Sequence, residues 1–77
     1  MTIDTQALNG MNTTERINYV RELALELFEG NHDSAERWLN SPNIALNHTT
    51  PIDFSKSLSG TKEVIMFIGR LEHGVFS

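Results

Sequence analysis

The chain contains no cysteine, which excludes disulfide bonds and thiolate metal sites. It also has no long apolar run: no stretch approaches the roughly 20 apolar residues of a membrane-spanning helix. The N-terminus lacks the basic start and the apolar segment of a signal peptide. We therefore expect a soluble cytoplasmic protein. Its 77 residues suffice for one small domain with a marginal core, for which self-association is a common remedy.

Basic residues are scarce as well. The chain has 6 lysines and arginines against 10 acids, and its net charge of -4 is the wrong sign for binding nucleic acid on its own. His32, His48 and His73 lie in separate segments, without the spacing that lets histidines share a metal ion. No glycine-rich loop follows a strand, so no phosphate site is predicted. We expect neither an enzyme nor a bound cofactor or metal.

Helix signals fill most of the chain and no segment has the pattern of a strand. The predicted fold is therefore all-α, a small bundle of about four short helices that forms a dimer. Residues 1–11 are predicted to be a flexible or loosely docked arm before a helical domain over residues 12–77. Three apolar residues of the arm remain candidates for docking on that domain: Ile3, Ala7 and Leu8.

The first predicted helix begins at a cap among residues 12–14 and is stopped by Gly30. Its apolar residues recur at three- and four-residue spacing and form one core-facing stripe: Ile17, Val20, Leu23, Ala24, Leu27 and Phe28. The opposite face carries the acids Glu22, Glu26 and Glu29. We interpret these acids as a solvated face, and an acidic docking surface is the alternative.

The second predicted helix is short. Asp33 or Ser34 is predicted to cap it, with Glu36 reaching back as in a capping box. Trp38 and Leu39 point inward in this pattern, and Trp38 would be the largest core residue. The alternative is that Trp38 forms a platform for a ligand.

The connection over residues 43–49 is a predicted loop, in which Ile44 and Leu46 fill the gap between helices. A third helix then starts with a Thr50 cap and a proline at its first position, and it is predicted to end at Gly60. The fourth helix is predicted to start at Thr61.

The fourth helix has five apolar residues in succession, so its apolar surface extends all the way round. The three helices before it look too few to cover it, and we expect some of Ile65, Met66 and Phe67 to meet another chain. Gly69, which costs about 1 kcal/mol against alanine in mid-helix, is either merely tolerated or marks a close approach of another backbone. The residues assigned to the dimer or the core are Trp38, Leu39, Val64, Ile65, Met66, Phe67, Ile68 and Leu71.

The C-terminal residues close this helix. If Gly74 takes the left-handed position past the helix end, the residue after it usually packs on an apolar side chain three or four places inside that end. Arg70 and Gly69 occupy those places. Val75 and Phe76 therefore have no partner on their own helix, and they are expected to pack on the core of the chain, on a second copy or on another protein.

The stretch from Ala24 to Phe76 resembles the toxin-binding domain of Xre/MbcA/ParS-type antitoxins, which pair with RES-domain toxins in bacteria. The matching pieces follow in the same order: Leu27-Phe28, Ala35 to Leu39 with Trp38-Leu39, Pro42-Asn43, Leu46, Thr50-Pro51, Gly60, Val64, and Gly69 to Phe76. Asn47-His48 stands where the family has a glycine-rich turn, and Phe54-Ser55 replaces a pair of leucines. The first departure is expected to change the loop, and the second to weaken the packing of the third helix.

This resemblance implies a dimeric helical domain that binds its toxin and blocks an active site that consumes NAD. The C-terminal residues to which it assigns the contact are Arg70, Glu72, His73, Gly74, Val75 and Phe76. Many relatives also have an N-terminal helix-turn-helix domain, for which this chain has no room. A detached toxin-binding domain, a truncated one and a short family member all stay open.

A small DNA-binding or transcription-accessory protein is the alternative function. The second and third helices would then form a helix-turn-helix. Against this, the connection over residues 43–49 is longer than the three or four residues of such a turn.

Overall fold

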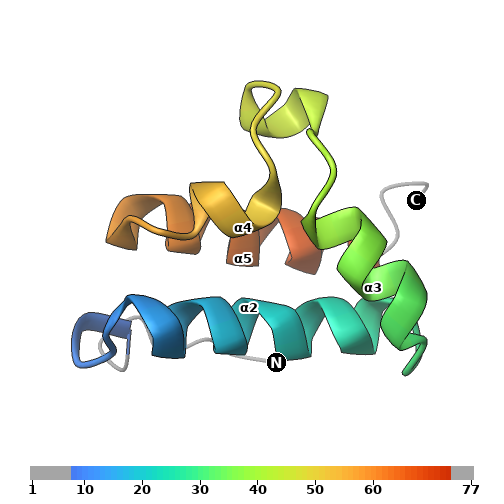
Figure 1. Ribbon diagram of the computed structural model, residues 1–77, viewed down its shortest axis with the longest axis horizontal. Helices are drawn as coiled ribbons and strands as arrows, with labels where there is room; N and C mark the ends of the chain where they lie inside the picture. The colour runs from blue at the N-terminus through green and yellow to red at the C-terminus, as the bar shows by residue number, and fades with distance from the viewer. Residues whose placement is uncertain (1–7, 74–77) are drawn as a thin grey trace.

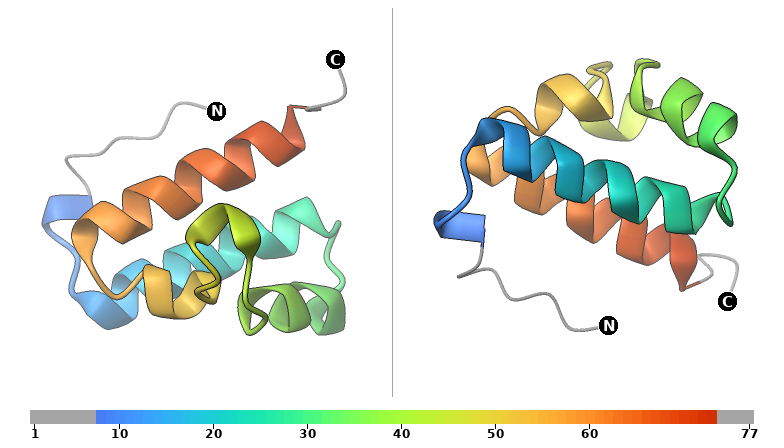
Figure 2. Two further views of the ribbon diagram at one scale, coloured as in Figure 1. Left: turned by 90° about the horizontal axis from the view of Figure 1, so that it is seen from above. Right: turned by 60° about the horizontal axis from the view of Figure 1, so that its bottom comes forward.

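The structure, a computed structural model, describes residues 8–73. Its elements are α2 (Thr13–Leu27), α3 (His32–Leu39), the 3-10 helix η1 (Ile44–Leu46), α4 (Pro51–Phe54) and α5 (Leu58–Glu72). No strand runs through the described residues, where the one β-bridge joins Asn43 to Thr49. The prediction of an all-α fold with about four short helices is confirmed. The two long helices α2 and α5 lie side by side, while α3, η1 and α4 form the connection between them (Figures 1 and 2).

The start of α2 follows from its capping residues. The Asn12 side chain accepts a hydrogen bond from the Glu15 backbone N–H at 2.8 Å, and the Glu15 carboxylate accepts one from the Asn12 N–H at 2.9 Å. This capping box satisfies two backbone donors that the helix leaves free. At the other end, Glu29 and Gly30 have φ angles of 55° and 86°. Two left-handed residues in succession end the helix and turn the chain toward α3.

The cap of α3 differs from the prediction. Asn31, rather than Asp33 or Ser34, is the N-cap, and its side chain accepts a hydrogen bond from the Ser34 N–H at 3.0 Å. With the cap at Asn31, Glu36 lies too far along the helix to close a capping box. Its carboxylate instead forms an ion pair with Arg21 of α2, with an Nε–Oε2 distance of 2.7 Å.

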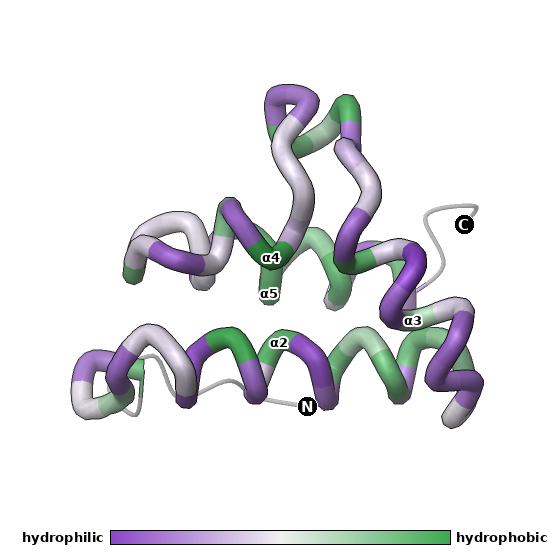
Figure 3. Tube along the Cα trace, in the orientation of Figure 1, coloured by the Kyte–Doolittle hydropathy of each residue, from purple (hydrophilic) through white to green (hydrophobic). Residues whose placement is uncertain are grey.

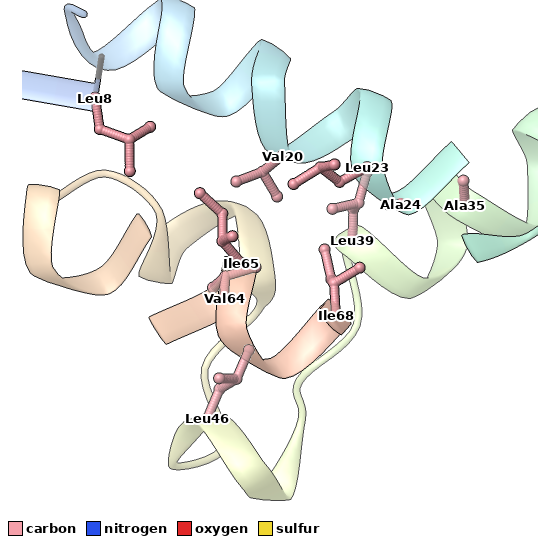
Figure 4. Close-up of a cluster of buried hydrophobic side chains, with 10 residues drawn as sticks. All are labelled: Leu8, Val20, Leu23, Ala24, Ala35, Leu39, Leu46, Val64, Ile65 and Ile68. Carbon is pink, nitrogen blue, oxygen red and sulfur yellow. The ribbon is translucent and has the colours of Figure 1, made fainter. Parts of the chain in front are cut away.

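The core lies between α2 and α5 and is closed by one or two side chains from each of α3, η1 and the segment before α2. Figure 4 shows its buried members, which are Leu8, Val20, Leu23, Ala24, Ala35, Leu39, Leu46, Val64, Ile65 and Ile68. Along the helices, hydrophobic and hydrophilic residues alternate in the manner of amphipathic segments (Figure 3). Leu8, which the sequence placed in the N-terminal arm, is part of this core, whereas Ile3 and Ala7 lie outside the described residues.

The loop over residues 43–49 buries one of the two apolar residues expected there. Leu46 is buried, but Ile44 is 81% exposed, so the prediction that Ile44 fills a gap is wrong. The turn is too tight for both side chains to be buried. The Asn43 side chain accepts a hydrogen bond from the Ala45 N–H at 2.9 Å, and η1 contains only Ile44–Leu46. With about 120° between successive residues of a 3-10 helix, Ile44 and Leu46 cannot face the same way.

Two residues of this loop have left-handed backbone. Asn47 has a φ of 60° and His48 a φ of 63°, a region that favours glycine over other residues. The resemblance places a glycine-rich turn at these positions in the family. This chain thus forms a turn with two positive φ angles although it has no glycine there.

The boundary between α4 and α5 also differs from the prediction. The helix that starts at Thr50 and Pro51 ends at Phe54. The next helix, α5, begins at Leu58 with Ser57 as its cap, so Gly60 does not end a helix. Gly60 lies in the first turn of α5, where a Cβ atom would be 1.7 Å from the carbonyl oxygen of Phe54. Glycine is needed here because the two helices meet backbone to backbone.

Two buried hydroxyl groups form hydrogen bonds at the corner between α4 and α5. The buried Ser55 donates a hydrogen bond to the Pro51 carbonyl at 2.7 Å, and the buried Thr61 hydroxyl lies 2.7 Å from the Ser55 carbonyl oxygen. Thr61 is therefore not the start of a helix but a buried residue inside one. Ser55, where the family has a leucine, is buried with its hydroxyl satisfied, which avoids the cost of an unpaired polar group.

The apolar surface of α5 is largely covered within the chain. Val64, Ile65 and Ile68 are buried, so of the three residues from which a contact with another chain was expected, Ile65 belongs to the core. Part of this cover comes from Leu46 and Leu8, which lie outside the four helices predicted from the sequence. Met66 is 58% exposed and Phe67 is half-buried, and these two residues remain available to a partner.

Candidate partner-binding site

The last turn of α5 carries three of the residues predicted to bind a partner. Arg70, Glu72 and His73 are all exposed, and His73 is the C-cap of the helix. Positively charged side chains such as Arg70 are favourable near this end, where the helix dipole is negative. The other predicted contact residues, Gly74, Val75 and Phe76, lie outside the described residues.

The three exposed residues do not share one face. Successive residues of an α-helix are about 100° apart, so Arg70 and Glu72 point about 160° away from each other around the axis. Arg70 and His73 lie instead on the side of Met66, at spacings of four and seven. The structure thus brings Arg70 and His73 together with Met66 and separates Glu72 from them.

An aromatic cluster lies next to this end of α5. The rings of Trp38 and Phe67 are stacked with centroids 6.1 Å apart, and the rings of Phe28 and Trp38 are tilted with centroids 6.3 Å apart. All three side chains are half-buried and pack against the core. We call Phe28, Trp38 and Phe67 the aromatic cluster. Trp38 therefore lies at the edge of the core rather than inside it.

A recess of about 320 Å³ opens at the aromatic cluster. It is lined by Phe28, Ser34, Arg37, Trp38 and Ser41. The exposed Arg37 forms no ion pair within residues 8–73, where the two ion pairs are Arg21–Glu36 and Lys56–Asp53. Half-exposed aromatic rings beside an unpaired arginine are typical of binding hot spots. The sequence pattern points to Trp38 but not to Arg37, whose only signal in the sequence is its position next to the tryptophan.

A second recess, of about 690 Å³, lies over the start of α5. Its lining residues are Thr49, Asp53, Phe54, Lys56, Ser57, Ser59, Gly60 and Glu63. Within it, a hydrogen bond from the Lys56 ammonium holds the pKa of the Asp53 carboxyl below its usual value. This ion pair, at 3.0 Å, is exposed and explained by the local turn.

Within residues 8–73, no group of three histidine, cysteine, aspartate or glutamate side chains is placed to hold a metal ion. None of the described helices is long and apolar enough to cross a membrane.

The helix-turn-helix alternative receives no support from this geometry. Between α3 and α4 lies a connection that contains η1 and the bridge from Asn43 to Thr49, far longer than the turn of that motif. The helix that would read DNA, α4, has only 4 residues, Pro51–Phe54. A recognition helix needs several residues along the major groove.

Comparison with known proteins gives a consistent result. A family model described as the antitoxin Xre/MbcA/ParS C-terminal toxin-binding domain matches residues 23–74, which include α3, α4, α5 and the aromatic cluster. Two curated relatives are each named Antitoxin Xre. One, from Yersinia enterocolitica serotype O:8 / biotype 1B, is 41% identical over 58 residues, and one from Photorhabdus laumondii subsp. laumondii is 38% identical over 58 residues.

Both matches cover 75% of this chain and 39% of the relative, so the chain spans about two-fifths of the length of these proteins. No solved structure matches the chain.

Proposed function

Since the chain belongs to the Xre/MbcA/ParS family of antitoxin toxin-binding domains, we propose that it is an antitoxin module that binds and inhibits a cognate RES-domain toxin. Its C-terminal end would enter the active site of the toxin, which consumes NAD. The module itself would catalyse nothing, act as a homodimer in the bacterial cytoplasm and bind no nucleic acid on its own.

The observation that carries this proposal is the exposed end of α5 beside the aromatic cluster. The family match continues to residue 74, past the end of α5 at Glu72. Arg70 and His73 are exposed there. Immediately after them, the sequence continues with Gly74, Val75 and Phe76. The rule for helix ends predicts no apolar partner for Val75 and Phe76 at Arg70 or Gly69.

A short C-terminal segment with apolar side chains can enter and block a concave active site of the toxin. A buried aromatic anchor commonly contributes more than about 2 kcal/mol to binding, and Phe76 is the candidate for that role. Arg70 can grip a carboxylate of the toxin with its fork of donors. Arg37 and Trp38, at the recess, would extend the contact beyond the C-terminal residues.

Deletion of Val75 to Ser77 tests the proposal. We expect the melting temperature to stay nearly unchanged, because these residues follow the last turn of α5. Toxin neutralisation should weaken by at least about tenfold, equivalent to about 1.4 kcal/mol. The measurements are thermal unfolding of the free protein and titration of toxin activity with the purified variant.

A matched control is Ile44→Ala, which also removes exposed apolar surface but at the loop over residues 43–49. This control should neutralise the toxin as the parent does. If the truncated protein unfolds, the deleted residues support the core instead. If it folds and neutralises normally, inhibition uses another surface, and the exposed acids Glu22, Glu26 and Glu29 become the next candidates.

A further inference from the structure

The recess at the aromatic cluster has apolar walls and one charged group. Phe28 and Trp38 line it and are half-buried, so part of each ring faces the open space. Among the described residues that line it, Arg37 is the one with a charge, and the other two are Ser34 and Ser41. The recess therefore complements a ligand in which an apolar group lies next to a negative charge.

The backbone that carries Arg37 is held in place by side-chain caps. The Ser41 hydroxyl donates a hydrogen bond to the Arg37 carbonyl at 2.6 Å, and the Asn40 amide donates one to the Glu36 carbonyl at 2.7 Å. These bonds satisfy two of the carbonyl groups that the C-terminal end of α3 leaves free. The carboxylate of Glu36, next to Arg37 in the sequence, is itself paired with Arg21 of α2. Arg37 therefore lies at the edge of the recess without an ion-pair partner within residues 8–73.

The nearest free acid on α3 lies on the side turned away from the recess. Trp38 and Arg37 are about 100° apart around the helix axis, and Asp33 lies about 40° further in the same direction. Asp33 precedes Arg37 by one turn, a spacing that allows an ion pair, but no such pair is formed. Around the helix, Arg37 thus lies between Asp33 and the indole ring.

Further charged groups lie near the aromatic cluster. Glu29 follows Phe28, while Glu63 and Arg70 lie one turn before and one turn after Phe67, and none of these three charged residues lines the recess. Because Coulomb energy falls with distance and is screened by salt, the charged group in contact with a ligand decides which sign the site prefers. At the recess that group is a guanidinium. The acids further away weaken the binding of an anion, but they do not create a site for a cation.

The aromatic rings provide a rigid apolar contact. Trp38 stacks on Phe67 and is tilted against Phe28, with centroid distances of 6.1 and 6.3 Å, so two neighbours hold the indole ring. A ring that is already held loses little conformational entropy when a ligand packs on it. The volume of about 320 Å³ is at the small end for ligand sites, which suits one or two side chains of a peptide segment.

We propose that the recess binds an acidic segment of the toxin, in which an aspartate or glutamate lies next to an apolar side chain. The carboxylate would accept two hydrogen bonds from the guanidinium fork of Arg37. The apolar side chain would fill the recess against Phe28 and Trp38. This inference rests on the proposed function and adds the chemistry of the toxin at a surface separate from its active site.

The recess and the end of α5 are close enough to contact one toxin molecule. Phe67, which stacks on Trp38, is five residues before the end of α5 at Glu72, or about 8 Å along the helix axis. All five residues that line the recess fall within residues 23–74, the part matched by the family model. The two contacts would then form one surface, with an arginine and aromatic rings as its anchors.

Arg37→Gln tests the contact with a carboxylate. We expect this variant to raise the dissociation constant of the toxin complex at least about tenfold, because the carboxylate loses its charged partner. Arg37→Lys should lose less affinity, since it keeps the charge but not the fork of donors. The matched control is Lys56→Gln, which removes the same charge at the second recess and should change the constant by less than about twofold. Isothermal titration calorimetry of the purified toxin into each variant gives these constants.

Ser34→Phe tests the apolar contact by filling the recess. Ser34 supports the Asn31 cap of α3 through its backbone N–H, so the substitution leaves that hydrogen bond in place. We expect the dissociation constant to rise at least about tenfold, because the new ring occupies the space of the ligand. The control is Ser59→Phe at the second recess, which should bind the toxin as the parent does.

Asp33→Asn tests the sign of the ligand. Removal of this acid should lower the dissociation constant by about twofold or more, because an acidic segment is then repelled less. A basic segment would respond in the opposite way: Asp33→Asn would weaken its binding and Arg37→Gln would strengthen it. Circular dichroism verifies that each variant folds.

The outcomes separate the two proposals. A toxin that does not bind the parent protein overturns the proposed function and this inference with it. Binding that is weakened by deletion of Val75 to Ser77, but not by Arg37→Gln, overturns the acidic segment alone, whether or not Ser34→Phe has an effect. The response expected of a basic segment overturns it as well. If Ser34→Phe fails to fold, the substitutions at the exposed Arg37 and Asp33 decide the matter.

Discussion

Two glycines of α5 should respond in opposite ways to replacement by alanine. At Gly60 the new Cβ atom would lie 1.7 Å from the Phe54 carbonyl oxygen and 2.9 Å from its carbon, while ordinary contacts begin near 3.4 Å. The obstacle is backbone, so α4 and α5 must move apart. At Gly69 the same atom meets nothing within 4 Å.

The loss at Gly60 has several parts. Overpacking costs about 1 to 3 kcal/mol. Movement of the corner also strains the Ser57 cap, whose side chain accepts from the Gly60 N–H at 3.0 Å, and the Thr61 hydrogen bond to the Ser55 carbonyl. These contacts contribute about 1 kcal/mol each. Alanine regains up to about 1 kcal/mol of helix propensity. We expect Gly60→Ala to lower the free energy of unfolding by about 2 to 4 kcal/mol.

Gly69→Ala should raise the free energy of unfolding by up to about 1 kcal/mol, because only the helix propensity changes. In a domain of this size, about 1 kcal/mol shifts the melting temperature by about 4 to 8 °C. Thermal unfolding followed by far-ultraviolet circular dichroism measures both variants, at low protein concentration so that self-association contributes little. A Gly60→Ala protein that melts with the parent would refute the close contact between α4 and α5. A Gly69→Ala protein that melts earlier would place a neighbour at Gly69.

Three further variants test separate parts of the structure. Trp38→Ala should lower the free energy of unfolding by about 2 to 3 kcal/mol, less than for a fully buried aromatic residue, because Trp38 is half-buried and stacks on Phe67; a change below about 1 kcal/mol in urea unfolding would contradict this packing. Asn12→Ala should cost about 1 kcal/mol through loss of the capping box, with Asn12→Asp as a near-neutral control, and equal melting of all three proteins would count against the cap. His48→Gly should raise the free energy of unfolding by up to about 1 kcal/mol, because the φ of 63° suits glycine, and a loss of stability would show that the histidine side chain is needed.

The starts of two helices could be predicted because their signals are local. Asn12 with Glu15, and Thr50 with the proline after it, satisfy backbone donors within one helical turn. A cap acts on N–H groups two or three residues away, so the sequence around it contains all the interacting parts. The apolar stripe of α2 is local in the same sense, because its period alone defines one face.

The boundary between α4 and α5 could not be predicted in this way. Both Ser57 and Thr61 are acceptable caps, and Gly60 fits either the end of one helix or the first turn of the next. The choice depends on the contact between Gly60 and the Phe54 carbonyl, which exists only once the two helices meet. The same holds for Thr61, whose hydroxyl bonds to the Ser55 carbonyl across the corner.

By itself the sequence determined an all-α chain, the starts of α2 and α4, the end of α2 before Gly30, and membership of the antitoxin family, because each depends on neighbours along the chain or on an order of short motifs shared with that family. Only the tertiary structure decided which apolar side chains are covered. Ile44 is exposed, against expectation, and Ile65 is buried while its neighbour Met66 is exposed, because burial depends on segments that are distant in the sequence, such as those of Leu8 and Leu46. The recess beside Trp38 and the exposure of Met66 have the same origin, because they lie where the cover from those segments ends.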